Sequence, residues 1–515
     1  MAMKMIPDNF NRTIKKILIL LIIFFAFIIN TNAQSVLDYP INDTGLNVCF
    51  DTLLVIPCSQ PGEPFYGQDA QYNGNQFSFQ ANNNGTVTDL NTGLMWQQFL
   101  FEDKYSYEDA LAAADSFSLG GYTDWRLPSI KEIYSLIDFR GITGLSAAQS
   151  TPYIDTNYFE FRYGDETVER FIDVQYASST EYVGTTMTGA FTIFGVNFAD
   201  GRIKGYGTMT PLGAAKLFEV KYVRGNTNYA INNFVDNGDG TINDNATGLM
   251  WSKSDNGNGL NWEEALSWVY IKNQENYLGY NDWRLPNAKE LQSIVDYTRS
   301  LQTTNSAAID PIFNVTPIVD EGGETNYPFY WASTTHADGA PQSLYTKAVY
   351  VAFGEALGFM QMPPNSGNYV LMDVHGAGSQ RSDPKQGDPD NFPHGFGPQG
   401  DVIRIYNFVR LVRDGVATEV KDLKSALPNE FRLDQNYPNP FNPTTMISYS
   451  VPTYGFVNLA VFNLVGEKVV QLVNKNVSEG NHQVSFNASD LTSGVYFYKI
   501  ENDGFTRVKK LIVLK

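Results

Sequence analysis

The stretch GYTDWRLPSIKEIYSLIDF (121–139) recurs in this chain as GYNDWRLPNAKELQSIVDY (279–297), with the two tryptophans 158 residues apart (283 − 125). In each copy Ser or Asn follows Leu-Pro, and a Glu stands three residues later, which is typical of a capped helix start. Apolar residues at spacings of 3, 4 and 7 then predict one buried helix face. The stretch therefore predicts the same turn and helix in two units.

Further blocks repeat on either side of this stretch. In chain order they are TDLNTGLMWQQ (88–98) with NDNATGLMWSK (243–253), YASST (176–180) with YWASTT (330–335), and closing Val-Arg pairs at 223–224 and 412–413. The offset rises from 155 to 189, so the second unit has about 34 extra residues (189 − 155) between its late strands. Units of this size are domains and not solenoid turns.

Each unit is predicted to be α+β. Asn/Gly turns followed by alternating strands indicate a hairpin. A helix is expected over 106–117, with Ser106 as N-cap and Asp109 three residues on, and its counterpart begins at Asn261 with Glu264 in the same relation. Short strands and glycine turns fill the later half of each unit.

The repeated motif residues allow two interpretations. The residues concerned are Trp96, Trp125, Arg126, Trp251, Trp283 and Arg284. A functional site would stack a sugar on a Trp and bind an anion with an Arg. Because the residues occur in both units at one structural place, we favour core tryptophans and an Arg that fixes the helix start.

Composition limits the class of partner. The 515 residues include 36 basic and 55 acidic groups, which argues against a nucleic-acid partner. A basic start, the apolar run 17–29 and small residues before Ala33 predict a secretory signal peptide over 1–33. No later stretch is long enough to be a transmembrane helix. Export makes a disulfide between Cys49 and Cys58 plausible.

The repeated blocks resemble one known family. GTVTDLNTGLMW, DWRLPSIKEI, ASST and YVRG are similar to the domain first described at the C-terminus of the Legionella collagen-like adhesin. The resemblance implies two tandem C-type-lectin-like domains, and in the named member a binder of sulfated glycans. Residues 34–426 have 24 basic and 47 acidic groups, so their charge disfavours a sulfated ligand.

The C-terminal part resembles a different module. QNYPNPFNP (435–443), GVYFYKI (494–500) and a late Lys-Lys pair are similar to the C-terminal sorting domain of type IX secretion substrates. The residues that match this signature are Asn439, Pro440, Gly494, Tyr496, Lys509 and Lys510. Alternating runs broken by Gly, Asn and Pro predict a small all-β, Ig-like sandwich. The resemblance implies that the secretion machinery and its sorting protease are partners.

These signals divide the chain into seven parts. They are a signal peptide (1–33), an N-terminal leader (34–64), lectin-like repeat 1 (65–228), lectin-like repeat 2 (229–415) with a loop insertion (360–404), a linker (416–427) and the sorting domain (428–515).

The insertion contains the candidate ligand-binding residues His375, Arg381, Asp383, Asp388, His394 and Asp401. Long loops without regular structure are usually functional or disordered. The alternative is a surface Ω-loop tied by Asp–Arg pairs. No cofactor is firmly implied. Calcium is considered for the loop that contains Asp236 and Asp239, but the EF-hand spacing fails and an Asx turn is favoured.

The predicted function is a secreted or cell-surface binding protein that recognises a glycan or surface partner. No catalytic residue is predicted, because no serine elbow, zinc-protease or phosphate-loop motif appears in the repeats. Two other interpretations stay open: an extracellular hydrolase acting on polysaccharide, and a structural surface-layer component.

Overall fold

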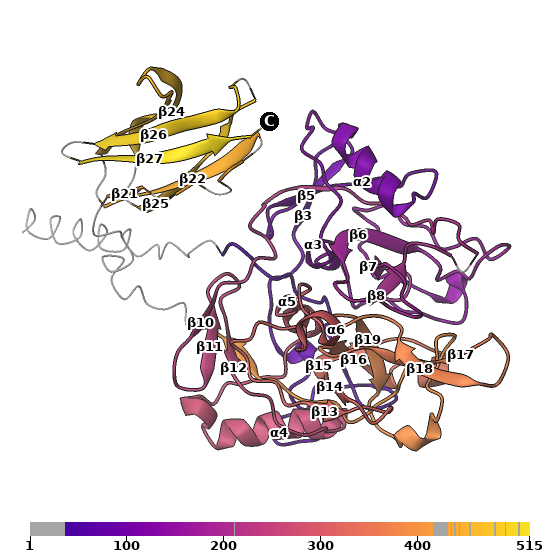
Figure 1. The fold of residues 1–515 in the computed structure, drawn as a ribbon. Coiled ribbons are helices and arrows are strands. Elements are labelled where there is room, and N and C mark those ends of the chain that lie inside the picture. The colour runs from indigo at the N-terminus through magenta and orange to yellow at the C-terminus, as the bar shows by residue number, and fades with distance from the viewer. Residues whose placement is uncertain are drawn as a thin grey trace, which may run out of the picture. The chain divides into compact units, whose positions relative to one another are not determined.

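The computed structural model describes residues 37–210, 212–415 and 431–514, except for 434, 437–438, 442, 453–454, 478–479, 490 and 503–504. The predicted signal peptide and the linker 416–427 lie outside the described residues. The chain forms two compact units, one containing both repeats and one C-terminal. Figure 1 shows the elements of each unit.

Each repeat contains one small antiparallel sheet of four strands, with the predicted hairpin at its centre. In the first repeat the order is β3 (Phe79–Ala81), β4 (Thr86–Asp89), β5 (Leu94–Gln97) and β9 (Val223–Gly225). In the second it is β10 (Phe234–Asp236), β11 (Thr241–Asp244), β12 (Leu249–Ser252) and β20 (Val412–Asp414). Trp96 and Trp251 lie at equivalent, fully buried positions. The closing Val-Arg pairs are therefore the last strands of these sheets.

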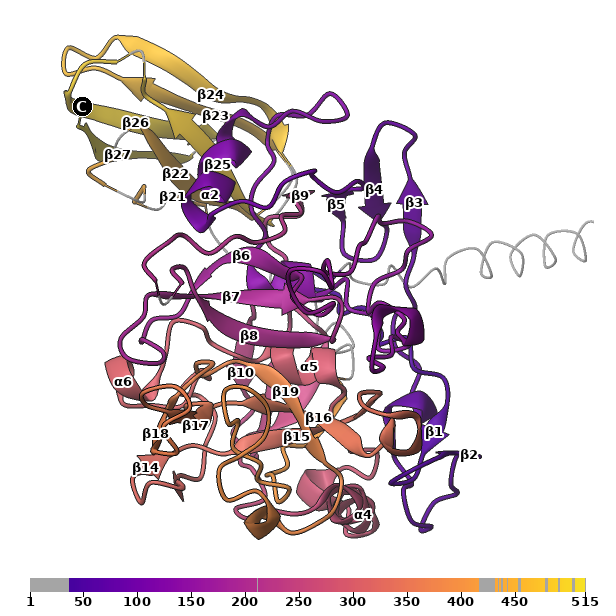
Figure 2. The same ribbon diagram turned by 90° about the vertical axis from the view of Figure 1, so that its right-hand side faces the viewer.

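A larger antiparallel sheet is shared by the two repeats (Figure 2). The first repeat supplies β6 (Gln175–Glu181), β7 (Thr192–Asn197) and β8 (Arg202–Gly207), and the second supplies β15 (Phe329–His336), β16 (Lys347–Ala352) and β19 (Gln380–Pro384). The order is β15-β16-β19-β8-β7-β6, and β19 pairs with β8 at Gln380 and Ile203. Because equivalent strands pair antiparallel, an approximate twofold axis relates the repeats. The tandem repeats are thus joined in one structural unit.

The predicted helices form with their predicted caps. They are α2 (Tyr107–Ser116) and α3 (Ile130–Tyr134) in the first repeat, and α4 (Trp262–Gln274) and α5 (Ala288–Ser293) in the second. The second repeat also has a short helix, α6 (Leu301–Thr304), that the sequence does not predict. The side chains of Ser106, Ser129, Asn261 and Asn287 each accept a hydrogen bond from the amide three residues on. These caps satisfy amide groups that have no partner within the helix.

A reciprocal pair of buried lysines joins helices α3 and α5 across the twofold axis. Lys131 Nζ donates to the carbonyl of Ser293 at 2.7 Å, and Lys289 Nζ donates to the carbonyl of Ser135 at 3.0 Å. Each ammonium therefore lies at the C-terminal end of the other repeat's helix, where carbonyl groups favour a positive charge.

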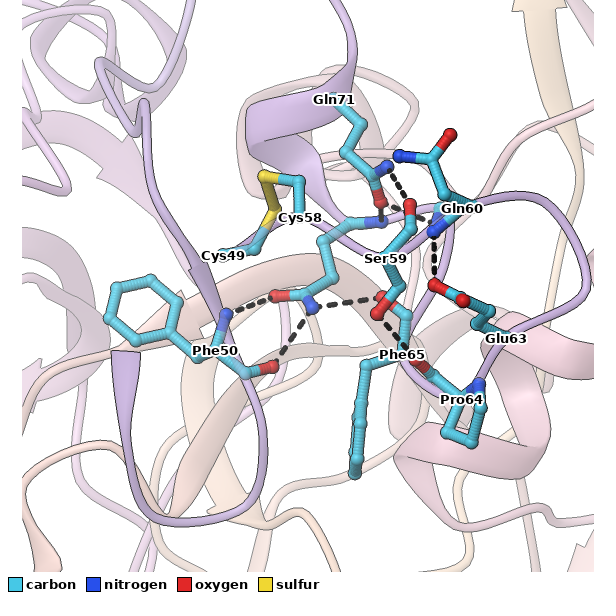
Figure 3. Close-up of a disulfide and its surroundings, with 11 residues drawn as sticks. Cys49, Phe50, Cys58, Ser59, Gln60, Glu63, Pro64, Phe65 and Gln71 are labelled. Carbon is cyan, nitrogen blue, oxygen red and sulfur yellow. Dashed lines mark hydrogen bonds between the residues drawn. A yellow bond between two sulfur atoms is a disulfide. The ribbon is translucent and has the colours of Figure 1, made fainter. Parts of the chain in front are cut away.

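The segment before the first repeat lies across both repeats. It contains β1 (Cys49–Phe50) and β2 (Val55–Ile56), and a short 3-10 turn, η1 (Asp69–Gln71), follows at the start of the first repeat. The predicted disulfide is confirmed, and Figure 3 shows Cys49 bonded to Cys58 beside Phe50. Phe50 packs on Tyr345 of the second repeat at 4.7 Å between ring centroids. The disulfide loop is therefore attached to the second repeat, although it precedes the first in sequence.

The predicted loop insertion 360–404 is not one unstructured loop, so this expectation is wrong. The range contains part of the hairpin β17 (Leu357–Gln361) and β18 (Tyr369–Asp373), the strand β19, which is the counterpart of β8, and a 3-10 turn, η5 (Pro389–Asn391). A second small hairpin, β13 (Ile318–Val319) with β14 (Thr325–Asn326), precedes β15. Strand β19 lies at the centre of the shared sheet. The longer connections of the second repeat therefore form two segments, one before β19 and one after it, which we call the extra chain.

The C-terminal unit is all-β, as predicted. One sheet has the order β21 (Arg432–Leu433), β22 (Thr444–Val451) and β25 (Gly480–Asn487). The other has the order β24 (Lys468–Val477), β23 (Gly455–Phe462), β26 (Gly494–Asn502) and β27 (Phe505–Val513). A single apolar cluster contains buried residues from both sheets, so they pack on each other.

The sorting-signature residues lie together at one end of this unit's β26–β27 pair. Asn439 Oδ1, next to Pro440, accepts a hydrogen bond from the amide of Ile512 at 2.9 Å. Gly494 begins β26, and the buried Tyr496 donates to the carbonyl of Thr492. Lys509 and Lys510 lie in β27, opposite β26.

Candidate functional site

The second repeat contains an open groove of about 610 Å³. We call it the aromatic groove. Its ring-bearing lining residues are Phe329, Phe359, Phe392, Tyr406 and Phe408, and its polar ones are Glu321, Asp390, Arg404 and Asn407. These residues come from the β13–β14 hairpin, the start of β15, strand β17 and the chain from η5 towards β20. Concave sites with aromatic walls and a few polar groups are typical of small-ligand binding.

Arg404 is fixed inside this groove by two contacts. Its guanidinium lies 4.0 Å from the centroid of the Phe329 ring. Its Nε and Nη2 donate to the two carboxylate oxygens of Glu321 at 2.9 and 3.1 Å. This bidentate pair neutralises the arginine charge locally. Asp390 adds another carboxylate, so the groove lining has more acidic than basic side chains.

Asp383 is a buried residue that binds the main chain along one wall of the aromatic groove. Its Oδ2 accepts hydrogen bonds from the amides of Arg404 and Ile405 at 3.1 and 3.3 Å and from Asn407 Nδ2 at 3.2 Å. Burial raises the pKa of the Asp383 carboxyl to about 6. Ile405 has a φ of 63°, a conformation that a β-branched residue rarely adopts. Asp383 therefore has a positioning role and keeps residues 404–407 in this shape.

Three of the six predicted ligand-binding residues form a buried network. His375 Nε2 lies 2.8 Å from Asp401 Oδ1, and Arg381 contacts both side chains. Burial and the charge of Arg381 lower the pKa of His375 to about 4, so the ring is neutral at pH 7. Burial acts to raise the pKa of Asp401, but Arg381 and His375 outweigh it and hold the pKa below its usual range. Beneath the surface, the network thus joins His375, which precedes β19, and Asp401, which follows it, to Arg381 in that strand.

Asp388 and His394 reach the surface beside the aromatic groove. Asp388 caps η5 by accepting a hydrogen bond from the amide of Asp390. The His394 ring stacks on Tyr369, with 3.8 Å between ring centroids, and lies edge-on to the groove residue Phe359 at 6.0 Å. Of the six predicted residues, these two and the supporting Asp383 are therefore the ones associated with the groove.

The repeated Trp-Arg motifs are structural. Trp125 and Trp283 are buried and donate their Nε1 hydrogens to the carbonyls of Leu119 and Tyr277. Arg126 pairs with Glu132, and Arg284 pairs with Glu290, the third residue of each capped helix. In both repeats the Trp therefore lies in the core and the Arg binds the glutamate at the helix start.

The loop considered for calcium forms Asx turns. Asp236 Oδ1 accepts a hydrogen bond from the amide of Gly238, and Asp239 Oδ1 accepts from the amide and hydroxyl of Thr241. Within the described part of the chain, no three or more His, Cys, Asp or Glu residues are grouped to hold a metal ion.

Sequence reasoning missed the main groove residues. Phe329, Arg404 and Tyr406 belong to no repeated motif. A fifth repeated block, Tyr-x-Ile-Asn at 39–42 and 229–232, was also missed, and its two tyrosine rings meet at 4.6 Å between the repeats. Its offset of 190 (229 − 39) exceeds the 155 of the block that follows it, because the disulfide segment comes after only the first copy.

Comparison with known families identifies two kinds of domain in the chain. A family model described as the Lcl C-terminal domain matches residues 85–223 and 240–374, together more than half of the chain. A model described as the secretion system C-terminal sorting domain matches residues 435–514. No curated protein matches the chain. The groove segment 389–408 lies outside all matched ranges.

The sorting domain indicates a secreted, cell-surface or extracellular protein that interacts with the type IX secretion machinery. None of the helices in the described residues is long and apolar enough to cross a membrane.

Proposed function

Because the chain belongs to the family defined by the Lcl C-terminal domain, we propose that it is an exported binding protein that recognises a glycan through its aromatic groove. The observation that supports this most is the groove itself, in which five rings surround a few fixed polar groups. Sugar rings present C–H faces that pack on aromatic rings, while their hydroxyls bond to carboxylates and amides. We also propose that the repeats are C-type-lectin-like and that the sorting domain is Ig-like.

The charge of the groove suggests which glycan it takes. Its one guanidinium is paired with Glu321, and Asp390 leaves an excess of negative charge. A sulfated chain would be repelled by this surface and by the acidic repeats, so we propose a neutral glycan.

The test uses the full secreted protein on an array of neutral and sulfated glycans, in calcium and in EDTA. We expect binding to neutral glycans and a loss of at least about tenfold in Tyr406→Ala, because truncating a stacked ring costs on the order of 1–2 kcal/mol. Phe191→Ala is the matched control, since its ring is 48 % exposed, like the 46 % of Tyr406, but lies in the first repeat. Wild-type protein that binds no glycan, or an unchanged Tyr406→Ala, would refute the proposal. Sugar release from polymers, lost in Glu321→Gln, would favour the hydrolase.

A further inference from the structure

A lysine, an asparagine and an aspartate meet where the two repeats join. Lys131 Nζ from the first repeat lies 3.0 Å from Oδ1 of Asn232 in the second repeat. Asn232 Nδ2 donates to Asp244 Oδ2 at 2.7 Å. Lys131 is 9 % exposed and Asp244 is 1 % exposed. An amine, a primary amide and a carboxylate are thus in consecutive contact in a largely buried place.

We propose that Lys131 and Asn232 form an intramolecular isopeptide bond, with Asp244 transferring the proton, so that the two repeats become covalently linked. The proposal is independent of what the aromatic groove binds. It depends on three conditions: an amine that can lose its proton, an amide carbonyl within reach and a proton carrier on the leaving nitrogen.

The first condition follows from burial. Desolvation lowers the pKa of the Lys131 amine to about 8, so a useful fraction is neutral near pH 7. Its nearest contacts are two carbonyl oxygens, Asn232 Oδ1 and the Ser293 main chain, and the Tyr39 ring lies 5.9 Å away. No carboxylate forms an ion pair with Lys131 in the described residues. The amine is therefore a stronger nucleophile than an exposed lysine at the same pH.

The second condition is geometric. The bond to Ser293 fixes Nζ while its other contact is the reacting carbonyl group itself. A carbonyl bond is only about 1.23 Å long, so an amine held at Oδ1 faces Cγ after a small rotation. Both side chains are held by the fold, which removes most of the entropy cost of bringing them together.

The third condition concerns Asp244. Its Oδ1 accepts from the amides of Asn233 and Ala246, and its Oδ2 accepts from Thr247 as well as Asn232. These bonds fix the carboxylate at the nitrogen that must leave. The neutral amine attacks Cγ of Asn232, and Asp244 takes a proton from the attacking nitrogen and passes it to Nδ2. The Cγ–Nδ2 bond then breaks, and the products are a secondary amide and ammonia, with no change in oxidation state.

The chain contains its own control at the twofold-related place. Asn42 Nδ2 donates to Asp89 Oδ2 at 2.7 Å, as Asn232 does to Asp244. However, Asn42 Oδ1 is occupied by Asn91, and Lys289 Nζ donates to the main-chain carbonyls of Asp43 and Ser135. Burial lowers the pKa of Lys289 to about 7, so its amine is at least as easily deprotonated. Since this lysine does not contact an amide side chain, no bond is expected there.

The experiment is peptide mapping of the purified full chain by mass spectrometry after denaturation and digestion. We expect a branched peptide joining Lys131 to Asn232, lighter by one ammonia than its two parts, with no trypsin cleavage after Lys131. Mapping is preferred to intact mass because Gln34, the expected first residue after signal cleavage, also loses ammonia if it cyclises.

Lys131→Arg should lose the branched peptide, and Lys289→Arg should keep it. Asp244→Asn should slow its formation by at least about tenfold, since a positioned proton carrier typically contributes more than that. Quantitative recovery of the two linear peptides from wild-type protein would overturn the proposal. Full cross-linking in Asp244→Asn would overturn the role of Asp244. If that variant does not fold, the wild-type and Lys131→Arg maps still decide whether the bond exists.

Discussion

The two repeats have a common set of helices and strands, which we call the frame, and differ in the connections between them. Both have the capped helix after Trp-Arg-Leu-Pro, the buried strand tryptophan and three strands in the common sheet. Four residues (198–201) connect β7 to β8, whereas 27 residues (353–379) connect β16 to β19. The extra chain on both sides of β19 (353–379 and 385–411) supplies most of the aromatic groove. The groove thus lies on connections that are longer than those of the first repeat, while the sheet order stays the same.

The largest expected effect tests whether the two repeats unfold as one unit. Trp96→Ala and Trp251→Ala each remove a fully buried ring from equivalent strands, which costs about 3–5 kcal/mol of unfolding free energy. Because the sheet is continuous across the repeats, each substitution should lower the stability of residues 37–415 as a whole. Denaturant unfolding followed by tryptophan fluorescence and by hydrogen exchange measures this.

The control for this pair is Leu212→Ala, whose side chain is 97 % exposed and should change stability by less than about 0.5 kcal/mol. Two separate transitions, with Trp96→Ala shifting one and Trp251→Ala the other, would show that the repeats unfold independently.

The frame was predictable from sequence because its signals are local. Ser129 and Asn287 follow Leu-Pro and precede Glu by three residues, and this spacing alone specifies a capped helix. The disulfide was predictable because the mature chain has only two cysteines. The shared sheet was not predictable, since pairing of β8 with β19 depends on contacts between residues 177 positions apart (380 − 203).

The groove was harder to predict than the frame. Asp383 was selected from sequence as a ligand, but burial makes it a support for residues 404–407. The position of His375 in a long predicted loop favours ligand binding, yet its ring lies in a buried network with Arg381. Composition suggests which residues can react, whereas only three-dimensional packing decides which of them reach the surface.

The second expected effect is a difference between the repeats in how their stability depends on pH. The four histidines, at 336, 375, 394 and 482, all lie outside the first repeat. Burial lowers the folded-state pKa of His375 to about 4, while the unfolded value is about 6.5. Between these values the unfolded chain binds more protons, so stability is lost as the pH falls through this window.

A shift of this size corresponds to about 3 kcal/mol. His375→Gln should therefore reduce the loss of stability between pH 6.5 and pH 4 by an amount of that order, measured by denaturant unfolding at each pH. The exposed His394→Gln is the control and should keep the wild-type dependence. Equal pH dependence in His375→Gln and wild type would show that this ring has the same pKa in the folded and the unfolded protein.

The smallest expected effect concerns the wall of the groove. Asp383→Ala leaves the amides of Arg404 and Ile405 without their side-chain acceptor, which costs about 1–3 kcal/mol. Because Ile405 has a φ of 63°, residues 404–407 should then open more often. We expect their amide hydrogens to exchange at least about tenfold faster. By strand register Tyr206 of the first repeat corresponds to Asp383, and its hydroxyl has no hydrogen-bond partner among the described residues. Tyr206→Phe should therefore leave exchange at 404–407 unchanged. If both variants behaved alike, the groove wall would depend on the sheet as a whole and not on this carboxylate.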